Sequence, residues 1–188
     1  MKRMILASGS PRRKELLQML EVPFEVLVSD TKEVITKNEP AEVTKELSYQ
    51  KAMAVAGQVE EGIIIGADTV VSIDGKILGK PADKEEAREM IYKLHGKSHM
   101  VYTGVTVIAK SGDMVSASSF AEGTKVNVAP MTENEIEAYI STDEPYDKAG
   151  AYGIQGLFGK FIEGIKGDYF NVVGLPVHRL YEELKKFD

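Results

Sequence analysis

The 188-residue chain contains no cysteine and only three histidines. The absence of cysteine excludes disulfides, thiolate metal ligands and a cysteine nucleophile, and it fits a reducing compartment. His95, His99 and His178 lack metal-ligand spacing, so we expect surface or structural roles for them. The chain also has no Walker loop, no Gly-x-Gly-x-x-Gly motif and no zinc pattern.

Long apolar runs are missing as well. Residues 1–6 carry two basic side chains and a short apolar run before polar Ser8, so we expect neither a signal peptide nor a membrane span, and a cytoplasmic protein. The formal net charge is -6, with 29 acidic and 23 basic residues, which argues against broad contact with duplex nucleic acid. A polyanion must therefore be bound by a local group of cations.

What the sequence does contain is an alternation of strand and helix patterns, with 43% hydrophobic residues and no linker-like segment. We expect a single domain over 1–188. The first patterns predict a strand over 4–7, a helix from Pro11, a strand over 24–28, a helix over 40–56 that stops at Gly57, and a buried strand containing 63–65.

Later patterns predict hairpins and capped helices. Asp74 and Gly75 indicate a tight turn, and residues 99–128 alternate as a long antiparallel hairpin around 111–113. Capping boxes at 83/86 and 132/135 predict two helix starts, and a last helix is expected from about 176 to 184. Mixed strand directions predict an α/β fold with a mixed, twisted sheet and flanking helices, and they argue against a purely parallel Rossmann sheet.

The turn after the first strand has the composition of an anion site. Ser10 can cap the next helix and Pro11 can be its first residue, which leaves free backbone N–H groups beside Ser8. Arg12 and Arg13 add two cations that can each bind phosphate oxygens bidentately. Ser8, Ser10 and Arg13 are therefore candidate phosphate-binding residues. A capped surface helix with solvated arginines is the alternative.

A second candidate group centres on Asp68, which follows a buried strand. A carboxylate leaving an apolar strand seldom stays there unpaired, and Mg²⁺ suits a site with one or two carboxylates plus substrate phosphates. Asp30 and Glu33 are candidates for the second acid, although either can equally be a solvated loop residue. Lys51 and Lys80 complete the cations that a nucleoside triphosphate requires; a lysine at the edge of a helix or in a turn is the alternative.

A glycine-rich segment over 146–156 separates the later helices and has little periodicity. Functional residues concentrate in such loops. Gln155 carries an amide that can bind the edge of a pyrimidine, and Tyr152 carries a ring that can stack on a base or pack in the core.

Taken together, Ser-Gly-Ser-Pro-Arg-Arg-Lys-Glu-Leu-Leu at 8–17, the motifs at 66–71 and 79–81, and the segments 147–156 and 167–176 resemble the Maf family of nucleoside triphosphate pyrophosphatases. The resemblance runs from the first predicted strand to the last helix. It implies a mixed α/β fold with two merged lobes around a central cleft, related to the inosine triphosphate pyrophosphatases, and commonly a homodimer. The segment 147–156 is similar to the family branch that acts on dTTP and UTP.

The resemblance also implies residue roles. Asp68 matches the family's catalytic acid, and Arg12, Thr69 and Gln155 match positions that select the substrate. The phosphate and metal positions of the family fall on Ser8, Arg13, Glu33, Lys51 and Lys80. We expect Asp68 and Glu33 to hold Mg²⁺ or Mn²⁺.

The resulting hypothesis is a house-cleaning enzyme that hydrolyses dTTP, UTP and related or modified pyrimidine triphosphates to the monophosphate and pyrophosphate. A nucleotidyltransferase is one alternative, because a strand, a Gly/Ser turn and an arginine also open such enzymes. A nucleotide-sensing regulator of cell division or septum formation is another, and it would bind triphosphate without turnover.

Overall fold

The computed structural model describes residues 3–28, 30 and 32–187, and the chain divides into two compact units. The first unit comprises Met1–Asp68, Thr103–Glu122 and Gly174–Asp188, and the second comprises Thr69–Tyr102 and Gly123–Val173. Among the described residues, seven strands form one sheet in the order β2-β1-β3-β5-β6-β7, with β4 beside β3. The sheet is mixed, which confirms the predicted α/β class.

Three neighbouring strands of the first unit run parallel. β1 (Met4–Leu6) pairs with β2 (Phe24–Val26) on one side and with β3 (Glu61–Ile73) on the other. The helix α1 (Pro11–Gln18) connects β1 to β2, and α2 (Pro40–Ala56) precedes β3. The bounds of α2 agree with the prediction because Pro40 starts the helix and Gly57 follows its end.

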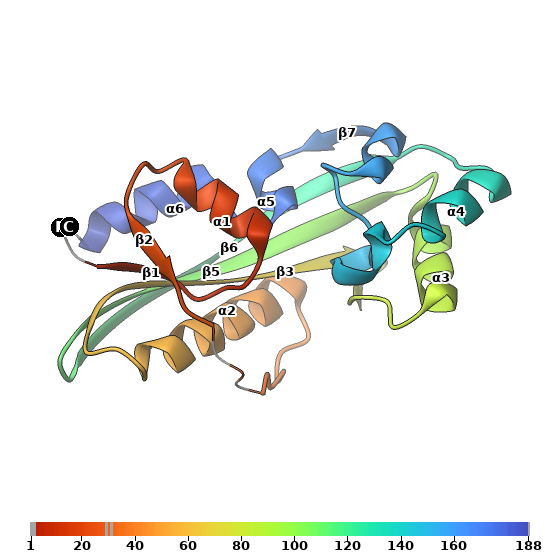
Figure 1. The fold of residues 1–188 in the computed structure, drawn as a ribbon. Coiled ribbons are helices and arrows are strands. Elements are labelled where there is room, and N and C mark those ends of the chain that lie inside the picture. Colours follow the sequence, from red (N-terminus) through yellow and green to blue (C-terminus); the bar gives the residue numbers. More distant parts are fainter. Residues whose placement is uncertain (1–2, 29, 31, 188) are drawn as a thin grey trace. The chain divides into compact units, whose positions relative to one another are not determined.

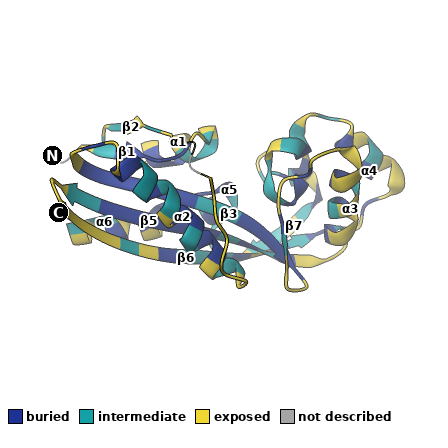
Figure 2. Cartoon of the chain, turned by 90° about the horizontal axis from the view of Figure 1, so that it is seen from below, coloured by how far each residue is buried: buried dark blue, intermediate teal, exposed yellow. Residues whose placement is uncertain are grey.

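Helices cover both faces of the sheet within the first unit. Figure 1 shows α1 and α6 (Val177–Leu184) on one face and α2 on the other. The residues buried between α2 and the sheet include Ile5, Ala52, Val55, Ile64 and Ile108. Strand β3 is buried along most of its length, as Figure 2 shows by colour.

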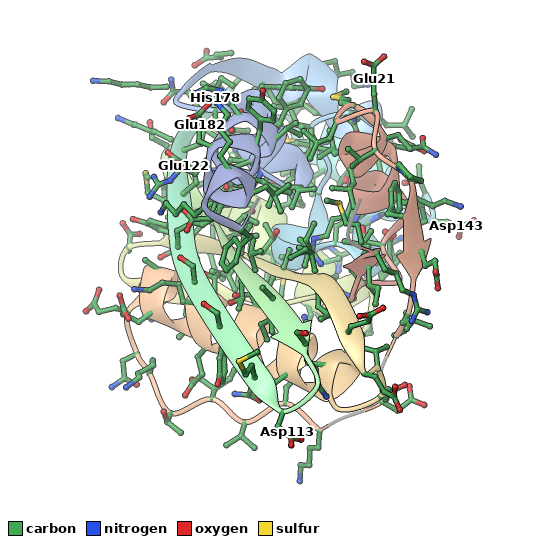
Figure 3. The ribbon with its side chains drawn as sticks, turned by 90° about the vertical axis from the view of Figure 1, so that its left-hand side faces the viewer. Glu21, Asp113, Glu122, Asp143, His178 and Glu182 are labelled. Atoms are coloured by element: carbon green, nitrogen blue, oxygen red, sulfur yellow. The ribbon has the colours of Figure 1, made fainter. Side chains whose placement is uncertain are left out.

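A long hairpin contributes to both units. β5 (Ser98–Ser111) and β6 (Met114–Val128) are hydrogen-bonded neighbours joined at Gly112 and Asp113, where the sequence predicts the turn. Gly112 adopts φ +58°, a conformation that favours glycine. Figure 3 labels Asp113 at this turn, and it also shows His178 and Glu182 on α6.

The second unit surrounds its own core. Asp74 and Gly75, both with positive φ, turn β3 back into β4 (Lys76–Leu78), as expected for a type I′ hairpin. The helices α3 (Lys84–Leu94) and α4 (Glu133–Ile140) pack together through apolar residues that include Ala87, Ile91 and Ile136.

The remaining elements of the second unit are short. They are η1 (Glu144–Asp147), η2 (Ala149–Ala151), η3 (Leu157–Phe161), β7 (Ile162–Lys166) and α5 (Tyr169–Val173); η4 (Lys185–Phe187) follows α6 in the first unit. Within the described chain, we find no helix with the length and apolar character needed to cross a membrane.

Two local expectations need adjustment. β2 ends at Val26, and because β2 is the edge strand, Val26 and Val28 stay exposed. At the start of α3 only half of the predicted capping box forms: the Asp83 side chain accepts from the Glu86 N–H, but the Glu86 carboxylate turns to the N–H of Ala82. The box at Thr132 and Glu135 is complete.

Candidate active site

Two predicted site residues of the first unit follow strands β1 and β2, and Asp68 lies inside the parallel strand β3. Leu6 of β1 pairs with Ile65 of β3, so the residue two places after β1, Ser8, comes level with the stretch just before Asp68. Glu33 follows β2. The carboxyl ends of neighbouring parallel strands are the usual position for ligand sites in α/β sheets.

Lys51 connects the two acids of this group. Its Nζ lies 3.1 Å from Glu33 Oε1 and forms a close ion pair with Asp68 Oδ1. The side chain of Asp68 is 14% exposed, whereas that of Glu33 is 47% exposed. The Asp68 carboxylate is therefore largely withdrawn from solvent, where its charge interacts more strongly with a neighbouring cation than in bulk water.

Two glycines let α2 approach the sheet closely enough for this contact. A Cβ built on Gly66 would lie 2.3 Å from the carbonyl oxygen of Ser48 and 2.9 Å from atoms of Ala52. A Cβ on Gly104 of β5 would lie 2.2 Å from the carbonyl carbon of Thr44. The α2 backbone thus rests directly on the strands, and Lys51 extends from that helix to Asp68.

Arg13 is held from two sides. Its Nε donates to the carbonyl oxygen of Gly174 at 2.9 Å, and its Nη1 donates to the buried Ser8 Oγ at 3.2 Å. Burial lowers the pKa of Arg13 below its ordinary value; the charges of Asp68 and Glu33 oppose this and that of Arg12 adds to it. The Arg13 guanidinium therefore lies within electrostatic range of Asp68, Glu33 and Arg12.

The remaining candidates of the first unit are Ser10, Arg12 and Asp30. Ser10 occupies the N-cap position of α1, but within the described chain its side chain makes no capping bond, and its N–H donates to Ser8 Oγ at 3.3 Å. Arg12 is partly buried on α1. Of the two acids considered after β2, Glu33 is the one that contacts Lys51, and Asp30 is exposed.

The donor set fits a hard divalent cation. Asp68 and Glu33 present carboxylate oxygens to one point, now marked by the Lys51 ammonium group. Across residues 3–28, 30 and 32–187, no group of three or more His, Asp or Glu side chains could hold a metal ion. Two carboxylates match Mg²⁺ or Mn²⁺, which complete their coordination with water and substrate phosphates.

Thr69, Lys80 and Gln155 belong to the second unit, so their approach to the group around Asp68 stays a prediction. Within β3 itself, every residue after Glu61 is buried except Asp68 and Thr69. The two partly exposed residues in this part of the strand are therefore ones with predicted roles. Lys80 and Gln155 are both exposed.

The segment that carries Gln155 is fixed by aromatic rings. Tyr152 is 5% exposed, and its ring lies 4.8 Å from that of Phe158 and 5.3 Å from that of His99. The Tyr152 hydroxyl and His99 Nε2 are 2.6 Å apart. Tyr152 therefore packs in the core, which was one of the two expectations for it. In the sequence, Gln155 lies midway between Tyr152 and Phe158, whose rings are both buried.

His99 has the buried structural role expected from its spacing. Burial lowers its pKa to about 4, so the ring is neutral at pH 7. Its Nδ1 is buried and finds no hydrogen-bond partner in the part of the chain that is described. The bond to Tyr152 is consequently the principal polar contact that orients the ring.

Sequence patterns did not identify the backbone contributors to the site. Gly174 supplies a carbonyl to Arg13 from 161 residues away, and the close approach of Gly104 to Thr44 of α2 also joins residues that are far apart in sequence. Gly66 offered a signal, since a glycine inside a buried strand often marks close backbone approach.

Comparison with known proteins is decisive for the family. A family model described as Maf-like protein matches residues 3–187. The chain belongs to the Maf family. Relatives named dTTP/UTP pyrophosphatase include those of Bacillus cytotoxicus, 53% identical, and Bacillus anthracis, 50% identical. Each alignment covers 100% of this chain and 97% of the relative.

The Maf chain also shares its fold with a solved structure of much lower identity. The Ham1 protein of Staphylococcus aureus superposes with a TM-score of 0.55 at 13% identity, and the match covers all of both chains. At this identity the likeness concerns the fold alone.

Proposed function

We propose that this chain hydrolyses dTTP and UTP to the nucleoside monophosphate and pyrophosphate. The observation that carries the proposal is the convergence of Asp68 and Glu33 on Lys51, within electrostatic range of Arg13. This arrangement provides acids and fixed cations at one place, which cleavage of a phosphoanhydride requires. The names of the relatives support the choice of pyrimidine triphosphates.

The charged residues have distinct roles in this proposal. Water attacks the α-phosphorus, the bond between the α-phosphorus and the bridging oxygen breaks, and pyrophosphate leaves. Asp68 orients the water and accepts its proton, since it is the less exposed acid. Arg13 and Lys51 stabilise the negative charge that grows on the phosphate oxygens, and Arg12 and Lys80 are proposed to assist them.

A divalent cation is part of the proposal. Asp68 and Glu33 would hold Mg²⁺ or Mn²⁺, and the bound ion supplies Lewis-acid polarisation of phosphate oxygens. The ion would take the place that the Lys51 ammonium group now occupies between the two acids, and Lys51 would then contact the phosphates. Arg12, Thr69 and Gln155 are proposed to select the nucleotide, on the basis of the family resemblance. The same resemblance supports a homodimer with a house-cleaning role. The cysteine-free composition fits a reducing compartment, in keeping with a cytoplasmic location.

Product analysis tests the proposal. Purified protein is incubated with dTTP or UTP and Mn²⁺, without any acceptor, and the products are separated by anion-exchange chromatography. Equal amounts of monophosphate and pyrophosphate are expected. Release of inorganic phosphate with a diphosphate would contradict cleavage between the first two phosphorus atoms. Turnover only after addition of an acceptor would favour a nucleotidyltransferase, and tight binding without turnover would favour a regulator.

A further inference from the structure

The segment that carries Gln155 is tied down by an acidic side chain that the proposed chemistry does not use. The Glu144 carboxylate accepts a hydrogen bond from the N–H of Leu157 at 2.7 Å and a second from the N–H of Phe158 at 3.3 Å. These are the first two residues of η3, so the carboxylate satisfies backbone donors that a short helix leaves unpaired. Gln155 precedes them by two residues.

Glu144 also connects this segment to a rigid element of the second unit. The Tyr139 hydroxyl, on α4, lies 3.2 Å from Glu144 Oε1 and 3.0 Å from the carbonyl oxygen of Ala151. Tyr139 is 4% exposed and belongs to the apolar core. One buried hydroxyl thus contacts both Ala151, which precedes the segment 152–156, and Glu144, whose carboxylate binds Leu157 and Phe158 after it.

Gly156 makes this packing possible. A Cβ on Gly156 would lie 2.4 Å from atoms of the Glu144 carboxyl group, and the three nearest atoms all belong to that group. The φ of Gly156 is -99°, a value that other residues adopt easily. The need for glycine here therefore comes from contact with Glu144 and not from backbone strain.

Lys148 encloses the segment at its other end. Its Nζ donates to the backbone carbonyl of Glu144 at 2.9 Å and to Asp147 Oδ1 at 2.6 Å. A Cβ on Gly153 would lie 2.9 Å from the Lys148 side chain. Each glycine that flanks Gln155 thus packs against a charged residue of the preceding turn.

We infer that Glu144 is a positioning residue for substrate selection: it fixes the segment 153–157 so that the Gln155 amide meets the pyrimidine base at one orientation. The inference rests on the proposed function and deepens it, since Glu144 itself touches neither the phosphates nor the reacting atoms. A hydrogen-bonding side chain that is fixed in one orientation discriminates between bases more strongly than a mobile one. With a mismatched base the fixed side chain is left without a partner, whereas a mobile one can turn to find another.

The test uses Glu144→Gln and Glu144→Ala in the full chain, with Glu163→Gln as the matched control. Glu163 is an exposed acid on β7 in the same unit. Hydrogen exchange of the Leu157 and Phe158 amides should accelerate by at least about tenfold in Glu144→Ala, because both lose their acceptor. Glu144→Gln retains one carbonyl acceptor and should give a smaller change. Unchanged exchange of Ile91 in α3 verifies the fold.

Activity provides the second readout. For Glu144→Ala we expect the ratio of kcat/KM for dTTP to that for dGTP to fall by about tenfold, mainly through the KM for dTTP, with kcat retained. Glu144→Gln should recover part of this ratio. A looser segment with an unchanged ratio would overturn the inference and leave the proposed function intact. Should wild type not hydrolyse dTTP, the proposed function fails, and equilibrium binding of dTTP against dGTP then tests the inference.

A double variant tests the contact itself. Gly156→Ala should lower the same ratio, because its methyl group displaces the carboxylate. In a Glu144→Ala background the added methyl group meets no carboxylate, so Gly156→Ala should have little further effect. Independent, additive effects of the two substitutions would contradict the proposed contact between Glu144 and Gly156.

Discussion

In the first unit the predicted site residues are held by charge, whereas in the second unit the segment that carries Gln155 is held by aromatic packing and backbone hydrogen bonds. Lys51 contacts two carboxylates, and Arg13 bonds to Ser8 and to a backbone carbonyl. In contrast, the packed rings of Tyr152 and Phe158 anchor the chain on either side of Gln155. In the proposed function, Lys51 and Arg13 of the first unit would stabilise charge on the phosphates, and Gln155 of the second unit would contact the base.

Asp68→Asn should have the largest effect, because it should abolish most of the turnover while nucleotide binding persists. Asparagine keeps the size of the side chain but cannot accept the proton from water, so kcat should fall by about 10³-fold or more, roughly 4 kcal/mol. Pyrophosphate release measures the loss, and nucleotide binding should persist. Asp74→Asn, at the turn between β3 and β4, is the control and should stay within about twofold of wild type, since Asn tolerates a positive φ. Activity of Asp68→Asn within tenfold of wild type would remove Asp68 from the mechanism.

Acidification should weaken the second unit through His99. The pKa of His99 is about 4 in the folded protein, below its ordinary value of 6.5, so the unfolded chain binds more protons between these pH values. The contribution to stability is complete above pH 6.5 and is lost as pH falls toward 4, at up to about 1.4 kcal/mol per pH unit, or about 3 kcal/mol in total.

Urea denaturation at several pH values measures this slope. Wild type should lose stability more steeply between pH 6.5 and 4 than His99→Gln does. His178→Gln is the control, because His178 is exposed on α6 and its replacement should leave the slope unchanged. Equal slopes for wild type and His99→Gln would show that His99 is not held neutral by burial.

Gly66→Ala should disturb the first unit with a smaller effect on stability. The added methyl group would collide with the backbone of Ser48 and with Ala52, so α2 must shift, at a cost of about 1–3 kcal/mol. The same shift should move Lys51 away from Asp68 and lower kcat. Gly164→Ala on β7 is the control, because a methyl group there meets no atom within 4 Å. Unchanged stability and kcat in Gly66→Ala would contradict the close docking of α2.

Local sequence signals predicted much of the fold. Pro40 and Gly57 delimit α2, Asp74 and Gly75 adopt the predicted turn, and Thr132 forms the complete capping box, because each of these features depends on neighbouring residues. The edge position of β2 was not predictable, since exposure of Val26 depends on strand order in the sheet.

The candidate site was predictable as a set of residue types but not as a set of contacts. A carboxylate leaving a buried strand and arginines after a Ser-Pro turn have local signatures. The approach of Lys51 to Glu33 depends on the close packing of α2, and the contact between Glu144 and η3 joins residues 13 positions apart through backbone N–H groups that every sequence possesses. Such contacts follow from tertiary packing. The sequence signals that point to this packing are individual glycines at positions of close approach.

The different roles proposed for Lys51 and Gln155 are tested most directly by measuring kcat/KM for dTTP and dGTP in wild type, Lys51→Met and Gln155→Ala. The account predicts that Lys51→Met lowers both values by a similar factor and leaves their ratio within about twofold, whereas Gln155→Ala lowers the ratio by about tenfold, or 1.4 kcal/mol, with kcat for dTTP retained. A change of the ratio in Lys51→Met as large as that in Gln155→Ala, or an equal loss for both nucleotides in Gln155→Ala, would contradict it.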